Sequence, residues 1–154
     1  MKIKDIMTPQ PSTCSPSTNL AEAGALMLAA DCGILPVVDE RGALAGIVTD
    51  RDLYVALATR NVQPSELTVG DVARTQVFTC LPDEEVETAL ATMKQHRIRR
   101  LPVEGFGGAV VGIVSMNDIV LASGPRSGVR TGAVVDTLQS ICAHHLPVPR
   151  VTAA

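Results

Sequence analysis

Two stretches of the sequence decide the fold: residues 42–52 read GALAGIVTDRD, and residues 108–118 read GAVVGIVSMND. Each stretch passes from a glycine through apolar residues to a hydroxyl residue and then an aspartate. The correspondence extends outward without a gap, because residues 4–53 align with residues 70–119 at 17 identical positions of 50. A repeat of this length is one supersecondary unit that cannot bury its apolar face alone. We therefore expect the two copies to pack on each other and to present any site twice.

Both copies show the same order of local patterns. A helical turn or approach strand leads to an extended piece, a helix, a hairpin of two strands and a second helix. This β-α-β-β-α order, found twice, predicts an α/β fold of the α+β type. The second hairpin strand is almost entirely apolar, so we expect it to be buried on both faces. The expected ranges are 4–7, 12–14, 20–31, 35–38, 43–48 and 50–60 in the first copy, and 70–74, 77–80, 85–96, 101–104, 109–114 and 116–123 in the second.

The repeat nearly fills the chain and divides it into four segments. We expect a first motif at residues 1–60, a connector at 61–69, a second motif at 70–123, and a linker with a helical tail at 124–154. The connector contains chain-breaking residues, and the tail carries one short amphipathic pattern at residues 134–143. Asn19 or Thr18 is expected to cap the first helix.

The composition excludes several classes of partner. Apolar residues make up 46% of the chain but aromatic residues only 2%, so the core must be aliphatic and few side chains could stack on bases. The net charge of −3 provides no basic field for a phosphate backbone, so no nucleic acid is expected. The sequence shows no signal-peptide pattern and no run long enough to span a bilayer, so we expect a cytoplasmic protein without membrane contact.

The four cysteines do not suggest a metal or redox motif. Cys14 and Cys80 are repeat counterparts, and we expect them to be small buried apolar residues, the alternative being an exposed thiol switch. Cys142, His144 and His145 fit no standard zinc spacing, so no metal site is expected.

The junction between the second hairpin strand and the following helix carries the strongest functional pattern. Thr49 and Asp52 in the first copy correspond to Ser115 and Asp118 in the second. One interpretation is a capping box, in which hydroxyl and carboxylate only satisfy backbone N–H groups. The other is a nucleotide site, because a helix start favours anions and a carboxylate can accept hydrogen bonds from a ribose diol. The sequence leaves both open at this point.

With these residues in view, the repeat resembles the CBS motif, named for cystathionine β-synthase. The chain resembles a stand-alone tandem CBS pair, or Bateman module, over about residues 3–122. The matching stretches are DIMTP at 5–9, LPVVD at 35–39, GIVTDRD at 46–52, HRIRRLPV at 96–103 and GIVSMND at 112–118.

The resemblance implies two pseudo-symmetric units with two clefts between them. In many members of the family these clefts bind AMP, ADP or ATP, and in some NAD or S-adenosylmethionine. The resemblance assigns ribose and phosphate contacts to Thr49 and Asp52, and to Ser115 and Asp118. It assigns adenine contacts and cleft-lining positions to Ile34, Leu35, Pro36, Arg100, Leu101, Pro102, Thr13, Cys14, Thr79 and Cys80.

The two copies differ in charge at the candidate site. Gly33 and Ile34 in the first copy become Arg99 and Arg100 in the second, and either arginine could pair with phosphate. The alternative for these arginines is a solvated helix end, where cations are favoured. Arg51, also a candidate nucleotide-binding residue, becomes an asparagine in the second copy. We therefore expect two clefts of unequal affinity.

These observations predict a regulatory module rather than an enzyme. No nucleophile or acid–base pair recurs between the copies, so no catalytic residue or catalytic cofactor is expected. The module would sense adenine nucleotides and signal in trans to an unknown protein target. The resemblance also implies a homodimer. The alternatives are a structural dimerisation module with vestigial clefts and a sensor of another adenosyl ligand, such as NAD or S-adenosylmethionine.

Overall fold

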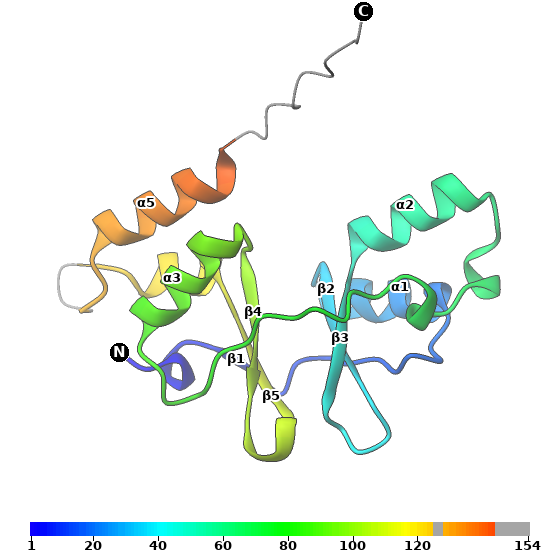
Figure 1. Ribbon diagram of the computed structural model, residues 1–154, viewed down its shortest axis with the longest axis horizontal. Coiled ribbons are helices and arrows are strands. Elements are labelled where there is room, and N and C mark those ends of the chain that lie inside the picture. Colours follow the sequence, from blue (N-terminus) through cyan, green and yellow to red (C-terminus); the bar gives the residue numbers. More distant parts are fainter. Residues whose placement is uncertain (125–127, 144–154) are drawn as a thin grey trace, which may run out of the picture.

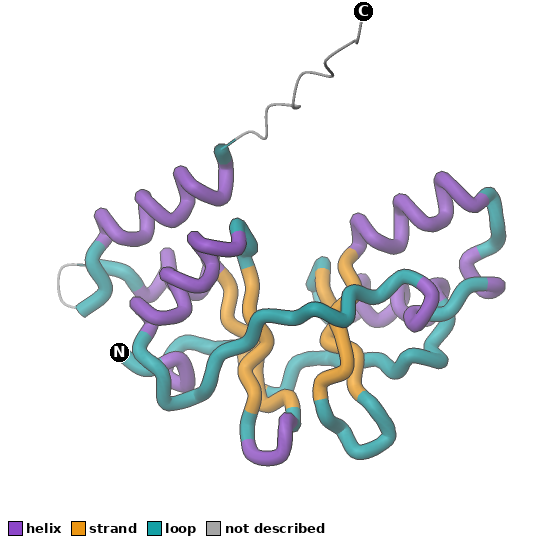
Figure 2. Tube along the Cα trace, in the orientation of Figure 1, coloured by secondary structure: helices purple, strands orange, loops and turns teal. Residues whose placement is uncertain are grey.

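The computed structural model describes residues 1–124 and 128–143, which form two similar halves side by side (Figure 1). Two β-hairpins stand next to each other in the middle, and the helices lie on their outer sides (Figure 2). The hairpins meet at an isolated antiparallel bridge between Ala43 and Ala109. The two copies of the repeat thus pack on each other, as the repeat predicts.

The helices and hairpin strands occur in the predicted order, with bounds within three residues of those expected. Asn19, one of the two predicted caps, accepts a hydrogen bond from the Glu22 backbone N–H at 2.9 Å. The first half contains α1 (Leu20–Ala29), β2 (Ile34–Val38), β3 (Leu44–Thr49) and α2 (Asp50–Arg60). The second half contains β1 (Thr8–Pro9), α3 (Val86–His96), β4 (Arg100–Glu104), β5 (Val110–Ser115) and α4 (Met116–Ala122), and α5 (Thr131–Cys142) follows. The 3-10 turns are η1 (Ile3–Asp5), η2 (Pro64–Glu66), η3 (Val69–Asp71) and η4 (Phe106–Gly108).

The sheets are small and antiparallel. Strands β2 and β3 form a two-stranded sheet, and β1, β5 and β4 form a three-stranded sheet in that order. Both hairpins have the same register, because Leu35 lies opposite Val48 and Leu101 lies opposite Val114. The prediction that the second hairpin strand is buried on both faces is wrong. In β3 and β5 buried and half-exposed residues alternate, since only one face packs against helices.

The leading segment of each copy crosses over to the other half. Ile3 is fully buried in the core of the second half, and its N–H donates to the Glu84 carbonyl at 3.0 Å. Its repeat counterpart Val69 is fully buried in the core of the first half, and its N–H donates to the Thr18 carbonyl at 2.8 Å. The blue and green connections in Figure 1 run between the halves in opposite directions. Each half therefore completes its core with a residue from the other copy.

The repeated glycine of the second hairpin strand makes room for this crossing chain. A Cβ atom on Gly46 would lie 2.9 Å from the Arg74 carbonyl oxygen, and one on Gly112 would lie 2.5 Å from the Met7 sulfur. Because Arg74 pairs with Ile47 in the same way that β1 pairs with β5, the close approach occurs at both copies. A side chain at either glycine would push the crossing segment away.

Helix α5 extends only one of the two halves. It packs on α3 and α4, where Val134 and Thr137 are buried, and Lys94 pairs with Asp136. Among the residues that the structure describes, no sixth helix covers α1 and α2 in the same way. None of the helices within these described residues has the length and hydropathy that a membrane-spanning segment requires.

Candidate functional site

The hydroxyl and the aspartate at each strand-to-helix junction form a capping box. In the first half, Asp52 Oδ2 accepts hydrogen bonds from Thr49 Oγ1 at 2.7 Å and from the Thr49 N–H at 3.0 Å. In the second half, Asp118 Oδ2 accepts from Ser115 Oγ at 2.7 Å and from the Ser115 N–H at 2.8 Å. The backbone N–H of each aspartate donates to the same hydroxyl. The capping-box interpretation is confirmed at both junctions.

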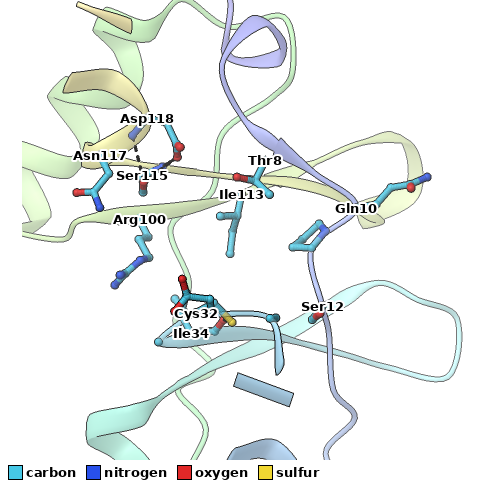
Figure 3. Close-up of a pocket in the computed structure, with 14 residues that line it drawn as sticks. Thr8, Gln10, Ser12, Cys32, Ile34, Arg100, Ile113, Ser115, Asn117 and Asp118 are labelled. Atoms are coloured by element: carbon cyan, nitrogen blue, oxygen red, sulfur yellow. Dashed lines mark hydrogen bonds between the residues drawn. The ribbon is translucent and has the colours of Figure 1, made fainter. Parts of the chain in front are cut away.

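One of the two junctions opens into a cavity of about 410 Å³ between the halves. Three segments line it: the crossing chain beside β1, the turn from α1 to β2, and the start of α4 with β4 and β5 (Figure 3). We call this cavity the open cleft. Its lining residues are Thr8, Gln10, Pro11, Ser12, Ala30, Asp31, Cys32, Gly33, Ile34, Arg100, Ile113, Ser115, Asn117 and Asp118.

The open cleft combines apolar surface with hydrogen-bonding and charged groups. Ile34 and Ile113 supply apolar walls from the two hairpins (Figure 3). Ser115 and Asp118 lie on one side, and the Arg100 side chain extends toward Cys32 and Ile34. A concave site with apolar walls and a few convergent polar groups is the usual form of a small-molecule site.

At the repeat counterpart of the open cleft, larger side chains contact one another. Thr8 corresponds to Arg74, which donates to Asp52 Oδ1 from Nη2 at 2.7 Å and from Nε at 3.2 Å. Ser12 and Ala30 correspond to Phe78 and His96, whose rings stack with centroids 3.5 Å apart. Larger side chains thus stand where the open cleft has small ones, and we call this place the filled cleft.

The contact with Arg74 changes the chemistry of Asp52. Partial burial would raise the pKa of this carboxyl, but hydrogen bonds from Thr49 and Arg74 outweigh that effect and lower the pKa below its ordinary value of 3.8. The Asp52 side chain is only 12% exposed beneath the guanidinium. Asp52 is therefore ionised at neutral pH and already engaged by a cation.

A second cavity of about 300 Å³ adjoins the open cleft on the side of α5. It shares Arg100, Ser115 and Asn117 with the open cleft. Its remaining lining residues are Arg99, Met116, Leu138 and Cys142.

Half of the predicted site residues lie at or beside the two clefts and the adjoining cavity. Four of them line the open cleft, and Arg99 lines only the adjoining cavity. Thr49 and Asp52 lie at the filled cleft, and Arg51 is exposed at the start of α2 beside them. The four in the open cleft are Ile34, Arg100, Ser115 and Asp118.

The other predicted residues do not reach the open cleft. Thr13 is half-buried outside it, and Thr79 donates a hydrogen bond to Glu104 at 2.8 Å. Burial raises the pKa of the Cys14 thiol to about 11 and that of Cys80 to about 12, so neither is an exposed thiol switch. The remaining six predicted residues are buried and do not line the open cleft: Cys14, Cys80, Leu35 and Leu101 lie in the two hydrophobic cores, and Pro36 and Pro102 are buried in β2 and β4.

Sequence reasoning missed the crossing segment of the open cleft. Thr8, Gln10 and Ser12 line it because the chain passes from one half to the other there, which no local pattern reveals. One signal was available: Gln10 and Gln76 are identical in the repeat although both lie in connecting segments. Asp31 and Cys32, also missed, follow the last turn of α1.

The described residues contain no cluster of side chains that could hold a metal ion. No group of three or more His, Cys, Asp and Glu side chains gathers within residues 1–124 and 128–143. His144 and His145 lie outside the described residues, so the expectation that they bind no metal with Cys142 is untested.

Comparison with known proteins shows the family. The chain belongs to the CBS domain family, whose model matches residues 3–59 and 69–124. Over 119 residues it is 37% identical to the CBS domain-containing protein YhcV of Bacillus subtilis strain 168, covering 77% of this chain and 83% of YhcV. The structure is thus a tandem CBS pair, the class of module that the repeat predicted.

Solved structures of CBS pairs show the same fold. The CBS domain pair of protein MJ0100, in complex with 5′-methylthioadenosine and S-adenosyl-L-methionine, matches with a TM-score of 0.72 and 31% identity, over 79% of this chain and 94% of that one. CBSX2 in complex with AMP matches with a TM-score of 0.67 and 26% identity, over 79% and 94%. Both neighbours hold adenosine compounds.

Proposed function

We propose that this protein is a regulatory module that binds an adenosine-containing ligand in the open cleft. The observation that carries the proposal is the position of Ser115 and Asp118 at the edge of a 410 Å³ cavity between the two CBS motifs. The ligands of the two solved CBS pairs support the adenosine class.

The chemistry of the open cleft suits each part of a nucleotide. Ile34 and Ile113 offer apolar walls for a base. The Asp118 carboxylate and the Ser115 hydroxyl can bind a ribose diol, and the Arg100 guanidinium can pair with a phosphate. Because Thr8 stands where the filled cleft has Arg74, no cation from the crossing segment covers Asp118.

The regulatory mechanism follows from the position of the ligand between the halves. A ligand that contacts both CBS motifs binds some of their relative arrangements more tightly than others, and it shifts the population toward those. The module would transmit this shift in trans to a protein target. AMP, ADP and ATP are the proposed ligands, with NAD and S-adenosylmethionine as further candidates.

The repeat supplies a matched pair of variants for the test. Asp118→Asn and Asp52→Asn both weaken a capping box, so both should lower stability by a similar amount, about 1 kcal/mol. Only Asp118→Asn should weaken ligand binding, by at least tenfold, because Asp118 lines the open cleft and Asp52 does not. Calorimetric titration with AMP, ADP, ATP, NAD and S-adenosylmethionine would measure the affinity of both variants and of the unaltered protein for each compound. The proposal fails if none of the five compounds binds the unaltered protein.

A structural role without a ligand is the second candidate, and the filled cleft favours it for that half of the molecule. The Arg74–Asp52 contact and the Phe78–His96 stack already satisfy the residues there. If both clefts were only structural, Asp118→Asn and Asp52→Asn would change stability alone and affect no ligand.

A further inference from the structure

We propose that the turns of the two hairpins form one docking surface for another protein, which presents an apolar pocket flanked by Lys or Arg side chains. The first turn covers residues 39–42 and the second covers residues 105–108, and we call the two together the turn surface. This inference does not depend on the identity of the ligand in the open cleft.

The two turns lie side by side at the lower edge of the molecule in the view of Figure 1. Ala43 and Ala109, which follow the turns, form the isolated antiparallel bridge between the hairpins. A Cβ atom on Gly108 would lie only 3.6 Å from the Cβ atom of Ala43. A partner that covers one turn therefore meets the other as well.

The second turn presents a phenylalanine that does not contribute to the fold. Phe106 is fully exposed, and neither hydrophobic core contains it. A Cβ atom on Gly105 would lie 2.6 Å from Val111 Cγ1, and Gly107 has a φ of +69°, which favours glycine. A hydrogen bond from the Gly105 N–H to the Ala109 carbonyl at 2.8 Å closes the turn. The glycines thus allow a tight turn that carries the aromatic ring outward.

The repeat shows that the hairpin does not need this ring. The first turn has Glu40 where the second has Phe106. Asp39 Oδ1 closes the first turn by accepting hydrogen bonds from the N–H groups of Arg41 and Ala43, both at 2.9 Å. Because the same hairpin can end in a fully charged turn, we attribute the exposed ring to a contact outside the chain.

The charges beside the ring favour a cationic partner. The carboxylates of Asp39, Glu40 and Glu104 lie on or next to the turns, together with the single guanidinium of Arg41. Among the described residues, neither Glu40 nor Arg41 forms a salt bridge. Lys and Arg side chains are attracted both by carboxylates and by the face of an aromatic ring. The same carboxylates repel the phosphates of a membrane surface or of a nucleic acid.

The turn surface is separate from the open cleft. Strand β2 runs from Ile34, in the open cleft, to the first turn, and β5 runs from the second turn to Ser115, in the open cleft. No residue of the two turns lines the open cleft. A ligand and a protein partner would therefore contact the same two hairpins without competing. A patch of two short turns suits a small, transient interface.

Photo-crosslinking from position 106 tests the proposal. The full chain would carry p-benzoylphenylalanine at position 106 in cells of its source organism, and the same label at position 28, an exposed leucine on α1, is the control. Irradiation should give a discrete adduct with another protein from position 106 but not from position 28. Peptide mass analysis should place the adduct in an apolar pocket flanked by Lys or Arg. Capture of a protein without that chemistry overturns the proposal.

The affinity of the purified partner for three variants separates the ring from the charges. Phe106→Ala should weaken binding at least about tenfold, as expected for an aromatic hot spot. Glu40→Lys should weaken binding severalfold, whereas Arg41→Gln should not weaken it, because Arg41 faces the partner's cations. Added salt should weaken binding of the unaltered protein. None of the variants should shift the midpoint of urea unfolding, since all three side chains are exposed.

Several results would overturn the proposal. The docking surface is excluded if position 106 gives no adduct of its own or only an adduct with a second copy of the chain. Equal affinity of Phe106→Ala and the unaltered protein would exclude the ring as an anchor. Sedimentation with phosphatidylglycerol vesicles should show no binding, and binding that Phe106→Ala abolishes would assign the ring to a membrane instead. Phe106→Ala should bind adenosine compounds as the unaltered protein does, so this inference and the proposed function fail or stand separately.

Discussion

At the scale of single residues, the two aspartates of the repeat show how one contact separates equivalent positions. Asp52 and Asp118 have the same hydrogen bonds to the preceding hydroxyl residue. Asp52 alone meets an arginine, because residue 74 is Arg whereas its counterpart is Thr8. The first carboxylate is therefore engaged within the fold, and the second borders a cavity.

The lowered pKa of Asp52 predicts a pH-dependent contribution to stability. Its ionised form stabilises the fold, so this contribution is present above about pH 4 and is lost as the pH falls through the lowered folded-state pKa. Asp52→Asn should cost about 1 kcal/mol at pH 7. Urea unfolding should show that the difference in free energy of unfolding between Asp52→Asn and the unaltered protein becomes smaller between pH 5 and pH 3.

Arg74→Gln provides the control for this prediction. This variant should lose less stability than Asp52→Asn, because the Arg74 side chain is 60% exposed and such ion pairs contribute little. Its loss of stability should also become smaller as the pH falls. If the difference in free energy of unfolding between Asp52→Asn and the unaltered protein stayed constant down to pH 3, the ionised Asp52 carboxylate would not be what stabilises the fold.

At the scale of elements, the crossing segments hold the two halves together. Turn η1 packs in the second half and η3 packs in the first, each with one fully buried aliphatic residue. The backbone contacts on both sides are related by the repeat. The elements of one copy therefore do not form a closed core without the other.

Truncation of either crossing residue should be costly although both lie in short turns. Ile3→Ala should lower the free energy of unfolding by about 2–5 kcal/mol, and Val69→Ala by somewhat less, because each leaves a cavity in the core of the opposite half. Leu28→Ala, at a position 85% exposed on α1, should cost less than about 0.5 kcal/mol. Denaturant unfolding would compare the three. A loss of under 0.5 kcal/mol for Ile3→Ala would show that η1 does not complete the second core.

At the scale of the whole molecule, apolar side chains remain exposed on repeat-related helices. Tyr54 and Val55 on α2 correspond to Val120 and Leu121 on α4, and Tyr54 is 72% and Leu121 85% exposed. Each helix thus exposes two successive apolar residues, and exposed apolar patches mark interaction surfaces. We propose that these helices form the interface of a homodimer.

Light scattering coupled to size exclusion tests the dimer. The unaltered protein should have twice the 16.1 kDa mass of the chain at micromolar concentration. The double variant Tyr54→Lys with Leu121→Lys should elute as a folded monomer. Phe106→Lys, at a fully exposed hairpin position, should remain dimeric and serves as the control. If the unaltered protein were a monomer at this concentration, the proposed homodimer would be excluded.

Much of the fold could be predicted from the sequence because helices, strands and caps depend on local residue patterns. The capping boxes at Thr49 and Ser115 and the helix bounds follow from residues close together in sequence. Burial of β3 and β5 was misjudged because an apolar strand does not reveal that a helix covers only one of its faces. Leu35 and Leu101 were placed at the site by resemblance, whereas strand alternation turns their side chains into the cores.

The sequence by itself determined that this chain is a tandem repeat with two capped strand-to-helix junctions of unequal charge, since repeat, periodicity and capping are properties of neighbouring residues. Only the tertiary structure decided which junction borders a cavity. That choice depends on Thr8 and Arg74, which reach the opposite half across a crossing chain. It also decided that Arg99 and α5 enclose a second cavity, because these residues meet through the packing of α5 on α3 rather than through any spacing in the sequence.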